Sequence, residues 1–257
     1  MKKLIDFSRY SSIKIGPIVE VEVIEKIDPA YEKLFLVGGA NNLLVSPTPP
    51  PLAILGKPFD FIRIENDELV IGGATVTGRV VSFCKRHDIA GFEFLSKLPG
   101  TIGGAVKLNA GVKEYEIKNV LKWIRTCEGV IPASKLKLEY RKTDIKHIIY
   151  EAGFKLERGY SEQLRQKLLK LRTNQPKEPS AGSVFKNPPG DYAGRLIEAV
   201  GLKGKRVGNM AWSDVHANFL VNLGCGTFEE AMELIDLAKK RVYEAFGVKL
   251  QEEIVIL

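Results

Sequence analysis

The amino-acid sequence predicts an α+β protein, because strand-like and helical segments follow one another along its 257 residues. Residues 34–72 contain five short apolar runs, "LFLV", "NLLV", "LAIL", "FIRI" and "ELVIGG", separated by the turn-forming stretches "SPTPPP", "GKP" and "END". Residues 75–89 and 227–247 instead show apolar side chains at helical spacing. A chain of this length can form one large domain or two modest ones, each with its own core.

Residues 75–156 contain a helical, a glycine-rich and a mixed segment. In "TVTGRVVSFCKRHDI", Val76, Val80 and Phe83 lie at helical spacing, and the basic residues near its end are typical of a helix terminus. Loops rich in glycine follow, in "AGFEFLSKLPGTIGGAVKLNAG". Residues 118–156 are mixed, with the apolar runs of "VLKWIRTCEGVI" and "HIIYEAGFKLERG" on either side of "EYRKTDI".

The polar, helix-forming stretch "YSEQLRQKLLKLRTNQPKEP" provides the best domain boundary, which we place near Leu156. The sequence therefore predicts a first domain over residues 1–156, with two subdomains, and a second domain over residues 157–257. The last helix has the clearest signals, since Thr227 and Glu230 form a capping box and Gly247 ends it. Its apolar face consists of Phe228, Ala231, Ile235, Ala238, Val242 and Phe246. The final residues, "VKLQEEIVIL", predict a terminal strand.

Composition and charge exclude several classes of protein. With 45% apolar and 27% charged residues, the chain is neither disordered nor fibrous. No continuous apolar region follows the basic N-terminus and no stretch approaches membrane-spanning length, so we expect a cytoplasmic protein without membrane insertion. The net charge of +7 suits an anionic partner such as a nucleotide. Nucleic acid is the less favoured partner, because most of the excess charge lies on helix faces that are usually solvated.

The cysteines and histidines do not form a recognisable motif. Cys84, Cys127 and Cys225 are odd in number and far apart, which excludes a disulfide framework and a CxxC motif and favours three buried thiols. The histidines at positions 87, 147 and 216 also lack metal-ligand spacing, so the sequence predicts no metal site. His216, in "WSDVHANFLVN", is interpreted as a packed histidine and not as a catalytic one.

Two glycine-rich segments are candidate phosphate-binding loops. In "LVGGANNLLV" and "LPGTIGGAVKLNAG", paired glycines come directly after apolar runs, and glycine lets backbone N–H groups approach a ligand closely. Neither segment is a GxGxxG or GxxxxGK[ST] motif, so neither the Rossmann nor the P-loop mechanism is encoded. Taken alone, each pair of glycines is more typical of a tight turn.

The order of several motifs is more specific than any one of them. "GGANNLLV", "GFEFLSKLPGTIGGAVKLNAG", "YRKTD", "PSAGSVFKNPPGDYAGRLIEAVGLKG", "HANFLVN" and "GVKLQEEIVIL" resemble the UDP-N-acetylenolpyruvoylglucosamine reductase family from about residue 30 to the C-terminus. The resemblance implies an FAD-binding domain of the vanillyl-alcohol-oxidase type followed by a smaller α+β substrate-binding domain. It also implies NADPH-dependent reduction of UDP-N-acetylglucosamine enolpyruvate to UDP-N-acetylmuramate for peptidoglycan, with no obligatory protein partner.

The resemblance assigns FAD contacts to the two glycine-rich segments. The residues concerned are Gly38, Gly39, Asn41, Asn42, Leu43, Pro99, Gly100, Thr101, Gly103 and Gly104. The chain departs from the family pattern at several positions. Ala40 and Asn41 replace the usual glycine-serine, "YSS" before Ile13 replaces Asn-Thr, and Lys97 stands where glycine is common. The chain is also short, similar to the compact members that lack an inserted loop over the substrate.

The resemblance also implies three catalytic residues. Ser183 in "SAGSVFKNP" matches the family's proton donor, and Lys186 and Asn187 are suited to bind polar or anionic groups of the substrate. Arg141 in "EYRKT" matches the family's arginine, whose planar guanidinium suits the substrate carboxylate, and Glu253 matches the glutamate that acts as an acid at the enolate-like intermediate. Strand alternation alone does not distinguish Glu253 from Glu252, and the position relative to "GVKL" decides for Glu253. Each residue also has a structural interpretation: a turn or helix-cap serine, a surface arginine on a strand, and a solvated terminal carboxylate.

Two alternatives remain from the sequence. The first is another flavin oxidoreductase of the same fold with a different substrate, which would not need a proton donor opposite the flavin. The second is a non-catalytic, basic nucleotide-binding or nucleic-acid-binding module, which a flavin-yellow purified protein would exclude.

Overall fold

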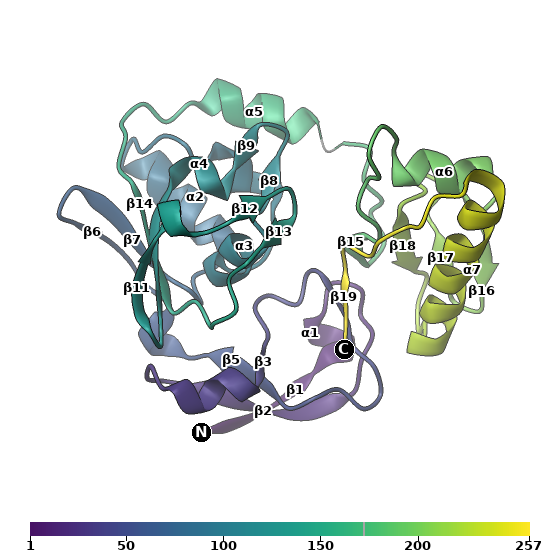
Figure 1. Cartoon of the computed structure of the whole chain (residues 1–257), viewed down its shortest axis with the longest axis horizontal. Coiled ribbons are helices and arrows are strands. Elements are labelled where there is room, and N and C mark those ends of the chain that lie inside the picture. Colours follow the sequence, from purple (N-terminus) through teal and green to yellow (C-terminus); the bar gives the residue numbers. More distant parts are fainter. Residues whose placement is uncertain (172) are drawn as a thin grey trace. The chain divides into compact units, whose positions relative to one another are not determined.

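The computed structural model describes residues 1–171 and 173–257, which form two compact units (Figure 1). The first unit contains residues 1–3, 21–39 and 51–173. The second unit contains residues 4–20, 40–50 and 174–257. Each unit has its own buried apolar core, as expected of a domain.

A five-stranded antiparallel sheet in the order β11-β10-β14-β7-β6 organises the first unit. Its strands are β6 (Ile62–Glu65), β7 (Glu68–Gly72), β10 (Leu121–Thr126), β11 (Gly129–Pro132) and β14 (Glu151–Lys155). Successive side chains of a strand point to opposite faces, so Leu69, Ile71 and Ile124 are buried on one face. Trp123 and Glu68 belong to the other face of the sheet, where the indole N–H of Trp123 donates to the Glu68 carboxylate at 2.6 Å.

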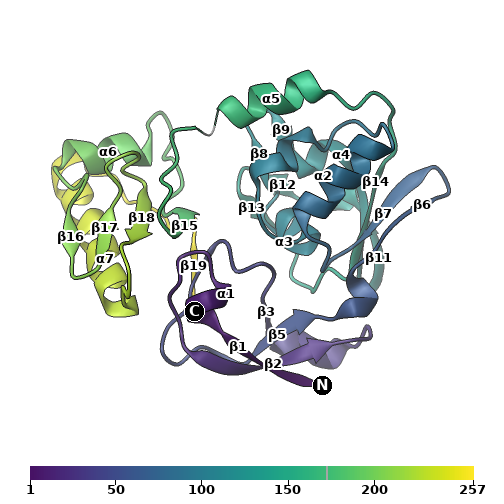
Figure 2. The same cartoon turned by 180° about the vertical axis from the view of Figure 1, so that it is seen from behind.

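Helices pack against the apolar face of this sheet (Figure 2). They are α2 (Thr77–Arg86), the 3-10 helix η3 (Glu93–Lys97), α3 (Ile102–Lys107), α4 (Ile117–Val120) and α5 (Glu162–Lys170). Val80 of α2, Val106 of α3 and Ile117 of α4 belong to one core. Leu168 of α5 joins the same core, so the first compact unit continues beyond the boundary that the sequence predicts near Leu156.

A smaller sheet has the strand order β1-β2-β5-β3. Its strands are β1 (Lys2–Asp6), β2 (Ile18–Ile24), β3 (Phe35–Leu36) and β5 (Leu52–Leu55), and β5 runs parallel to both β2 and β3. Further short elements are η1 (Pro29–Lys33), η2 (Lys57–Phe59), β8 (Gly111–Val112), β9 (Tyr115–Glu116), η4 (Ala133–Lys135), β12 (Leu138–Glu139) and β13 (Lys142–Thr143). Ile24, Ala53, Phe59, Ile148 and Tyr150 form the local core.

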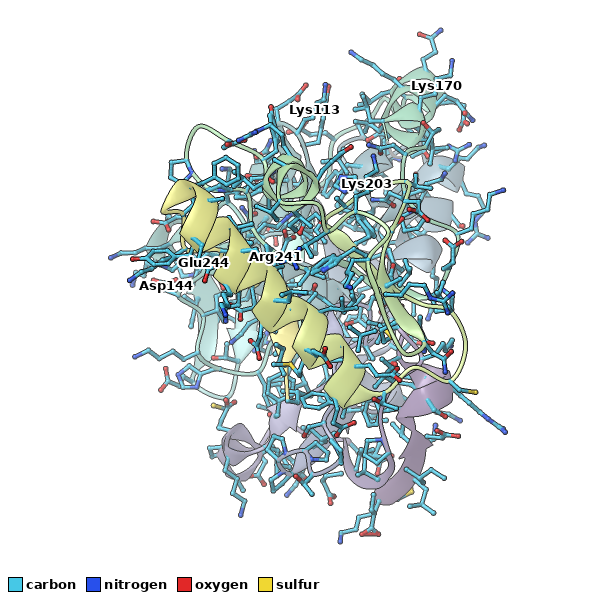
Figure 3. All side chains as sticks on the ribbon, turned by 90° about the vertical axis from the view of Figure 1, so that its right-hand side faces the viewer. Lys113, Asp144, Lys170, Lys203, Arg241 and Glu244 are labelled. Carbon is cyan, nitrogen blue, oxygen red and sulfur yellow. The ribbon has the colours of Figure 1, made fainter. Side chains whose placement is uncertain are left out.

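The second unit contains the antiparallel sheet β15-β18-β17-β16. The strands are β15 (Ser180–Ser183), β16 (Arg206–Val207), β17 (Met210–Trp212) and β18 (Phe219–Asn222), and the helices are α6 (Ala193–Ala199) and α7 (Phe228–Phe246). Both helices share a core with β17 and β18, in which Trp212 is fully buried. The exposed residues Arg241 and Glu244 mark the outer side of α7 (Figure 3).

Segments from both ends of the chain complete the second unit. Helix α1 (Phe7–Tyr10) comes from its N-terminal part, and β4 (Leu43–Leu44) pairs in parallel with β19 (Val255–Ile256). Ile13, Ile15 and Leu44 contribute to the same core as the helices α6 and α7. The C-terminal strand is shorter than the sequence predicts, because only Val255 and Ile256 have a regular strand partner, together with an isolated bridge at Glu252.

The structure confirms the predicted last helix. Thr227 Oγ1 accepts a hydrogen bond from Glu230 N at 3.2 Å, and the Glu230 carboxylate accepts one from Thr227 N at 3.1 Å. Gly247 ends the helix in the left-handed conformation, with φ +66°, where a side chain would be strained. Within residues 1–171 and 173–257, no helix has the length and apolarity required to cross a membrane.

The expectation of three buried cysteines is wrong for two of them. Cys84 is buried in α2, but Cys127 is only half-buried and Cys225 is exposed. Cysteine spacing excludes a disulfide framework but carries no information on which turn of the chain reaches the surface. Burial raises the pKa of the Cys84 thiol to about 12, so this thiol is unreactive at neutral pH.

Candidate active site

Ser183 lies at the end of strand β15 and not in a loop or helix cap. It is paired with Phe219 of β18, and the ladder is irregular between Ser180 and Ser183. Gly182, directly before it, has φ +84°, and apart from its two chain neighbours no residue of 1–171 and 173–257 has an atom within 4 Å of the position that a Cβ would occupy. The backbone at Gly182 therefore borders open space and needs a residue without a side chain. Because Tyr192 is the N-cap of α6, the alternative of Ser183 as a helix cap is wrong.

Asn218 fixes the backbone that follows Ser183. Its side-chain Oδ1 accepts a hydrogen bond from Phe185 N at 3.0 Å, and its Nδ2 donates to Phe185 O at 2.7 Å. The backbone carbonyl of Asn218 also accepts from Val184 N at 2.8 Å. Asn218 is buried, so these bonds are shielded from water. In the sequence, Asn218 stands directly before the apolar run "FLV", but no sequence signal reveals this positioning role, because it depends on one amide that bonds to a segment 33 positions away.

We expect Asn218→Ala to destabilise the protein. The change leaves both the N–H and the carbonyl of Phe185 without the amide, and each buried polar group left unsatisfied costs about 1–3 kcal/mol. Urea unfolding should therefore show a lower midpoint with an unchanged slope. Asn209→Ala is the matched control on the same unit, and an equal midpoint shift in both variants would contradict the role assigned to Asn218.

Glu253 lies directly beside the Ser183 segment. Its backbone N–H donates to Val184 O at 2.7 Å, and Lys186 N donates to Gln251 O at 2.9 Å. The C-terminal segment thus runs along the residues that follow β15. Within the second unit, the structure brings together two of the three catalytic residues that the sequence predicts, although they are far apart in the sequence.

The neighbouring Glu252 has a structural partner. Its Oε1 accepts a hydrogen bond from Lys239 Nζ of α7 at 2.6 Å. Burial raises the pKa of the Glu252 carboxyl, but the hydrogen bond from Lys239, a backbone hydrogen bond and the charge of Lys239 together outweigh it and hold the pKa below its ordinary value. A carboxylate held in such a pair is a poor proton donor, which counts against Glu252 as the catalytic acid.

The first glycine-rich loop contributes two asparagines to the second unit. Asn42 Nδ2 donates to Glu253 O at 2.9 Å, and Val255 N donates to Asn42 O at 2.9 Å. Asn41 Nδ2 donates to the hydroxyl of Ser12. Two of the positions at which the chain departs from the family pattern therefore contact each other. Leu43 is buried in β4, so its contribution is to packing.

The two predicted substrate-binding residues follow Ser183 in the chain. Lys186 is half-buried, and Asn187 is exposed. The Oδ1 of Asn187 accepts from Ala193 N, the first residue of α6, at 3.1 Å, which fixes the orientation of its amide. His216 accepts from Asn218 N through Nδ1 at 3.2 Å and packs against the ring of Phe219. Burial lowers the pKa of His216, as expected for the packed, neutral histidine that the sequence predicts.

In the first unit, the glycine-rich loops lie against each other. A Cβ built on Gly38 would come within 2.7 Å of Thr101 Oγ1, so the loop of Gly38 and Gly39 passes close to the loop of Pro99 and Gly100. Thr101 caps α3, with its Oγ1 accepting from Gly104 N at 3.4 Å. The close approach depends on the absence of a side chain at Gly38.

Gly103 and Gly104 have different surroundings. A Cβ on Gly103 would meet the backbone of Gly73, with the carbonyl oxygen at 3.0 Å, and Gly103 N already donates to that oxygen at 2.9 Å. A Cβ on Gly104 would meet only Thr101 Oγ1, at 3.6 Å. Gly103 is therefore a packing glycine whose amide is used within the fold, whereas Gly104 borders open space.

Arg141 lies in the two-residue loop between β12 and β13. Its φ is +53°, which for a residue with a side chain costs on the order of 1–3 kcal/mol. Its Nη2 donates to Gly111 O at 2.7 Å, and its guanidinium lies 5.5 Å from the ring centre of Tyr140. Arg141 belongs to the first unit, whereas Ser183 and Glu253 belong to the second.

Comparisons with known proteins give consistent results. A family profile for the C-terminal domain of UDP-N-acetylenolpyruvoylglucosamine reductase matches residues 175–257. The chain is 47% identical to the enzyme of that name from Helicobacter hepaticus, over 99% of this chain and 98% of the relative. It is 44% identical to the Helicobacter pylori (strain ATCC 700392 / 26695) enzyme of that name, over 100% of this chain and 99% of the relative.

A solved structure shows the same architecture. The crystal structure of UDP-N-acetylenolpyruvylglucosamine reductase from Thermus caldophilus matches with a TM-score of 0.88 and 30% identity, covering 100% of this chain and 98% of that one. Together with the profile match to residues 175–257, this similarity confirms the predicted α+β fold with a distinct C-terminal domain.

Proposed function

The chain belongs to the UDP-N-acetylenolpyruvoylglucosamine reductase family, and from this premise we propose how its own residues perform the reaction. It is a flavin oxidoreductase that reduces UDP-N-acetylglucosamine enolpyruvate to UDP-N-acetylmuramate in peptidoglycan precursor synthesis. Similarity over the whole chain, at 47% identity to one relative, carries this conclusion. A non-catalytic nucleotide-binding or nucleic-acid-binding module is not compatible with it.

We assign FAD as the flavin and NADPH as the reductant. The residues of the first unit fit a dinucleotide, because a Cβ at Gly104 would meet only Thr101 Oγ1, at 3.6 Å, and Gly38 allows its loop to lie against Thr101. The residues that would hold FAD there are Gly38, Gly39, Pro99, Gly100, Thr101 and Gly104. In the second unit, Asn41 and Asn42 are the corresponding polar residues. Bound FAD, once reduced by NADPH, would supply the hydride that the vinyl carbon of the substrate accepts.

A matched pair of substitutions tests the glycine assignment. Gly104→Val should lower the flavin content per chain with little change in the urea midpoint of the flavin-free protein, because its Cβ would make only an ordinary contact with Thr101 Oγ1 at 3.6 Å. Gly103→Val should instead lower the urea midpoint, because its Cβ meets the backbone of Gly73. Flavin absorbance and chain concentration give the occupancy. Full occupancy in Gly104→Val would remove this residue from the site.

Ser183 is the proposed proton donor. Reduction of the enolpyruvyl group requires a proton on the carbon next to the one that accepts the hydride. The Ser183 hydroxyl is a weak acid, so it depends on neighbouring groups. The open space beside Gly182 leaves room for a substrate at this strand end, and Asn218 holds the backbone after Ser183 in place.

Glu253 and Arg141 are the proposed electrostatic partners. The Arg141 guanidinium would bind the enolpyruvyl carboxylate and stabilise the negative charge that develops on it. Glu253 is held beside the Ser183 segment by the bond from its N–H to Val184 O. Lys186 and Asn187 are the proposed contacts for polar or anionic groups of the UDP-sugar.

Colour provides the experiment that tests this function. The purified protein should be yellow, NADPH should bleach it, and UDP-N-acetylglucosamine enolpyruvate should restore the colour with formation of one UDP-N-acetylmuramate per NADPH consumed. A colourless protein, or bleaching that the substrate does not reverse, would contradict the proposed reaction.

A further inference from the structure

Three potential metal-binding side chains meet in the first unit, and none of them belongs to the glycine-rich segments. Glu32 comes from η1, Cys127 from the turn between β10 and β11, and His147 from the segment before β14. One ligand atom of each residue lies within 4.8 Å of the ligand atoms of the other two. Because these residues are separated by tens of positions, sequence spacing gives no sign of the cluster.

The distances suit a tetrahedral ion. The Cys127 Sγ lies 3.7 Å from His147 Nδ1, and the same nitrogen lies 3.6 Å from Glu32 Oε2. Tetrahedral zinc, with bonds of about 2.3 Å to sulfur and about 2.1 Å to nitrogen and oxygen, places S and N about 3.5 Å apart and N and O about 3.4 Å apart. The two distances from His147 Nδ1 therefore lie within a few tenths of an ångström of those around such an ion, whose fourth position would be left to water.

The surrounding contacts orient two of the three side chains. The second ring nitrogen of His147, Nε2, lies 3.3 Å from a carboxylate oxygen of Glu128. A metal-bound histidine typically donates its other N–H to a carboxylate, which fixes the ring and raises the basicity of the ligand nitrogen. The Glu32 carboxylate is also oriented, since Ile148 N donates to its two oxygens at 3.1 and 3.3 Å.

Charge and access are both compatible with a cation. Two carboxylates, those of Glu32 and Glu128, lie within 3.6 Å of the His147 ring. The Lys107 ammonium, whose charge interacts with Glu32, donates to the backbone carbonyls of Ile145 and Lys146. The His147 side chain is 31% exposed and that of Glu128 is 64% exposed, so an ion can enter from solvent.

We propose that Glu32, Cys127 and His147 form a zinc site, with Glu128 as the hydrogen-bonding partner of His147. A thiolate, an imidazole and a carboxylate are ligands that Zn²⁺ accepts together, whereas Mg²⁺ and Ca²⁺ require oxygen ligands. The ion would join η1, the β10–β11 turn and the segment before β14. It would therefore stabilise the first unit and protect Cys127 from oxidation.

Cobalt provides a spectroscopic probe. Co²⁺ added to the metal-free holoenzyme should give, as a difference spectrum, the visible bands of tetrahedral cobalt and a near-ultraviolet thiolate-to-metal band at one ion per chain. Zn²⁺ should displace it. The thiolate band should be lost in Cys127→Ser and retained in Cys225→Ser, the matched control at an exposed cysteine.

A second variant tests whether Glu128 is the hydrogen-bonding partner of His147. Glu128→Gln changes an exposed side chain and should weaken Zn²⁺ binding by about 10–100-fold, with the cobalt bands retained. Zn²⁺ should also raise the urea midpoint of the wild-type chain but not that of Cys127→Ser.

Three results would each contradict the proposed zinc site. They are the absence of one-to-one Co²⁺ binding in the wild type, a thiolate band that survives in Cys127→Ser, and loss of that band in Cys225→Ser. If Cys127→Ser fails to fold, Glu128→Gln decides, because an unchanged Zn²⁺ affinity in that variant contradicts the proposed geometry.

Discussion

Replacing Ser183 by Ala should slow the reduction of UDP-N-acetylglucosamine enolpyruvate by about 10²–10⁴-fold, the usual contribution of a general acid. Reduction of the bound flavin by NADPH needs no proton from this side chain, so the rate of this half-reaction should stay near that of the wild type. Stopped-flow measurement of the two half-reactions separates these effects. Because Ser183 ends strand β15 and the cap of α6 is Tyr192, we do not expect the loss of about 1 kcal/mol that removal of an N-cap causes.

Ser183→Cys tests whether another proton donor can replace the hydroxyl. A thiol can also give up a proton, so this variant should recover part of the lost rate, although the larger sulfur displaces the donor. Equal rates of substrate reduction in the wild type and Ser183→Ala would show that the hydroxyl has no chemical role and that the strand end serves packing alone.

Glu253→Gln should also slow the reduction of the substrate by reduced flavin far more than the reduction of the flavin by NADPH. The change keeps the size of the side chain but removes its charge and acidity, so the expected loss is again about 10²–10⁴-fold. The backbone bond from residue 253 to Val184 O does not involve the side chain and remains, so binding of flavin should be unchanged. The two half-reactions are again measured separately.

Glu252→Gln is the matched control, one residue away on the same segment. Its carboxylate pairs with Lys239 on a partly exposed surface, where such pairs contribute about 0–1 kcal/mol to stability. We therefore expect near wild-type rates for both half-reactions and at most a small decrease in the urea midpoint. The reverse pattern, with Glu252→Gln slow and Glu253→Gln normal, would show that the catalytic carboxylate is the other one.

The sequence predicted the features that depend on local signals. The capping box of Thr227 and Glu230 and the closing glycine define α7, because both act within one helical turn. The five short runs of residues 34–72 correspond to β3 to β7, since alternation between apolar runs and turn formers is also a local property. The family motifs added the order of the site residues along the chain.

Features that depend on distant contacts could not be predicted in this way. Gly103 looks like Gly104 in the sequence, but only the fold shows that the backbone of Gly73 lies against it. The partners of Asn218 and of Glu252 lie across a sheet and on a helix, and a pattern of residue types does not reveal them. The cluster at Cys127 is a further example, because its members are neighbours only in the folded chain.

The second unit consists of segments that are far apart in the sequence, and this affects its folding during synthesis. Asn42 bonds to Glu253 across 211 positions, and β4 has β19 as its partner. During synthesis on the ribosome, residues 4–20 and 40–50 emerge well before their partners in the same unit, which lie within residues 174–257. This unit therefore cannot fold until residues 174–257 have been synthesised, and before then its early segments are accessible to chaperones and proteases.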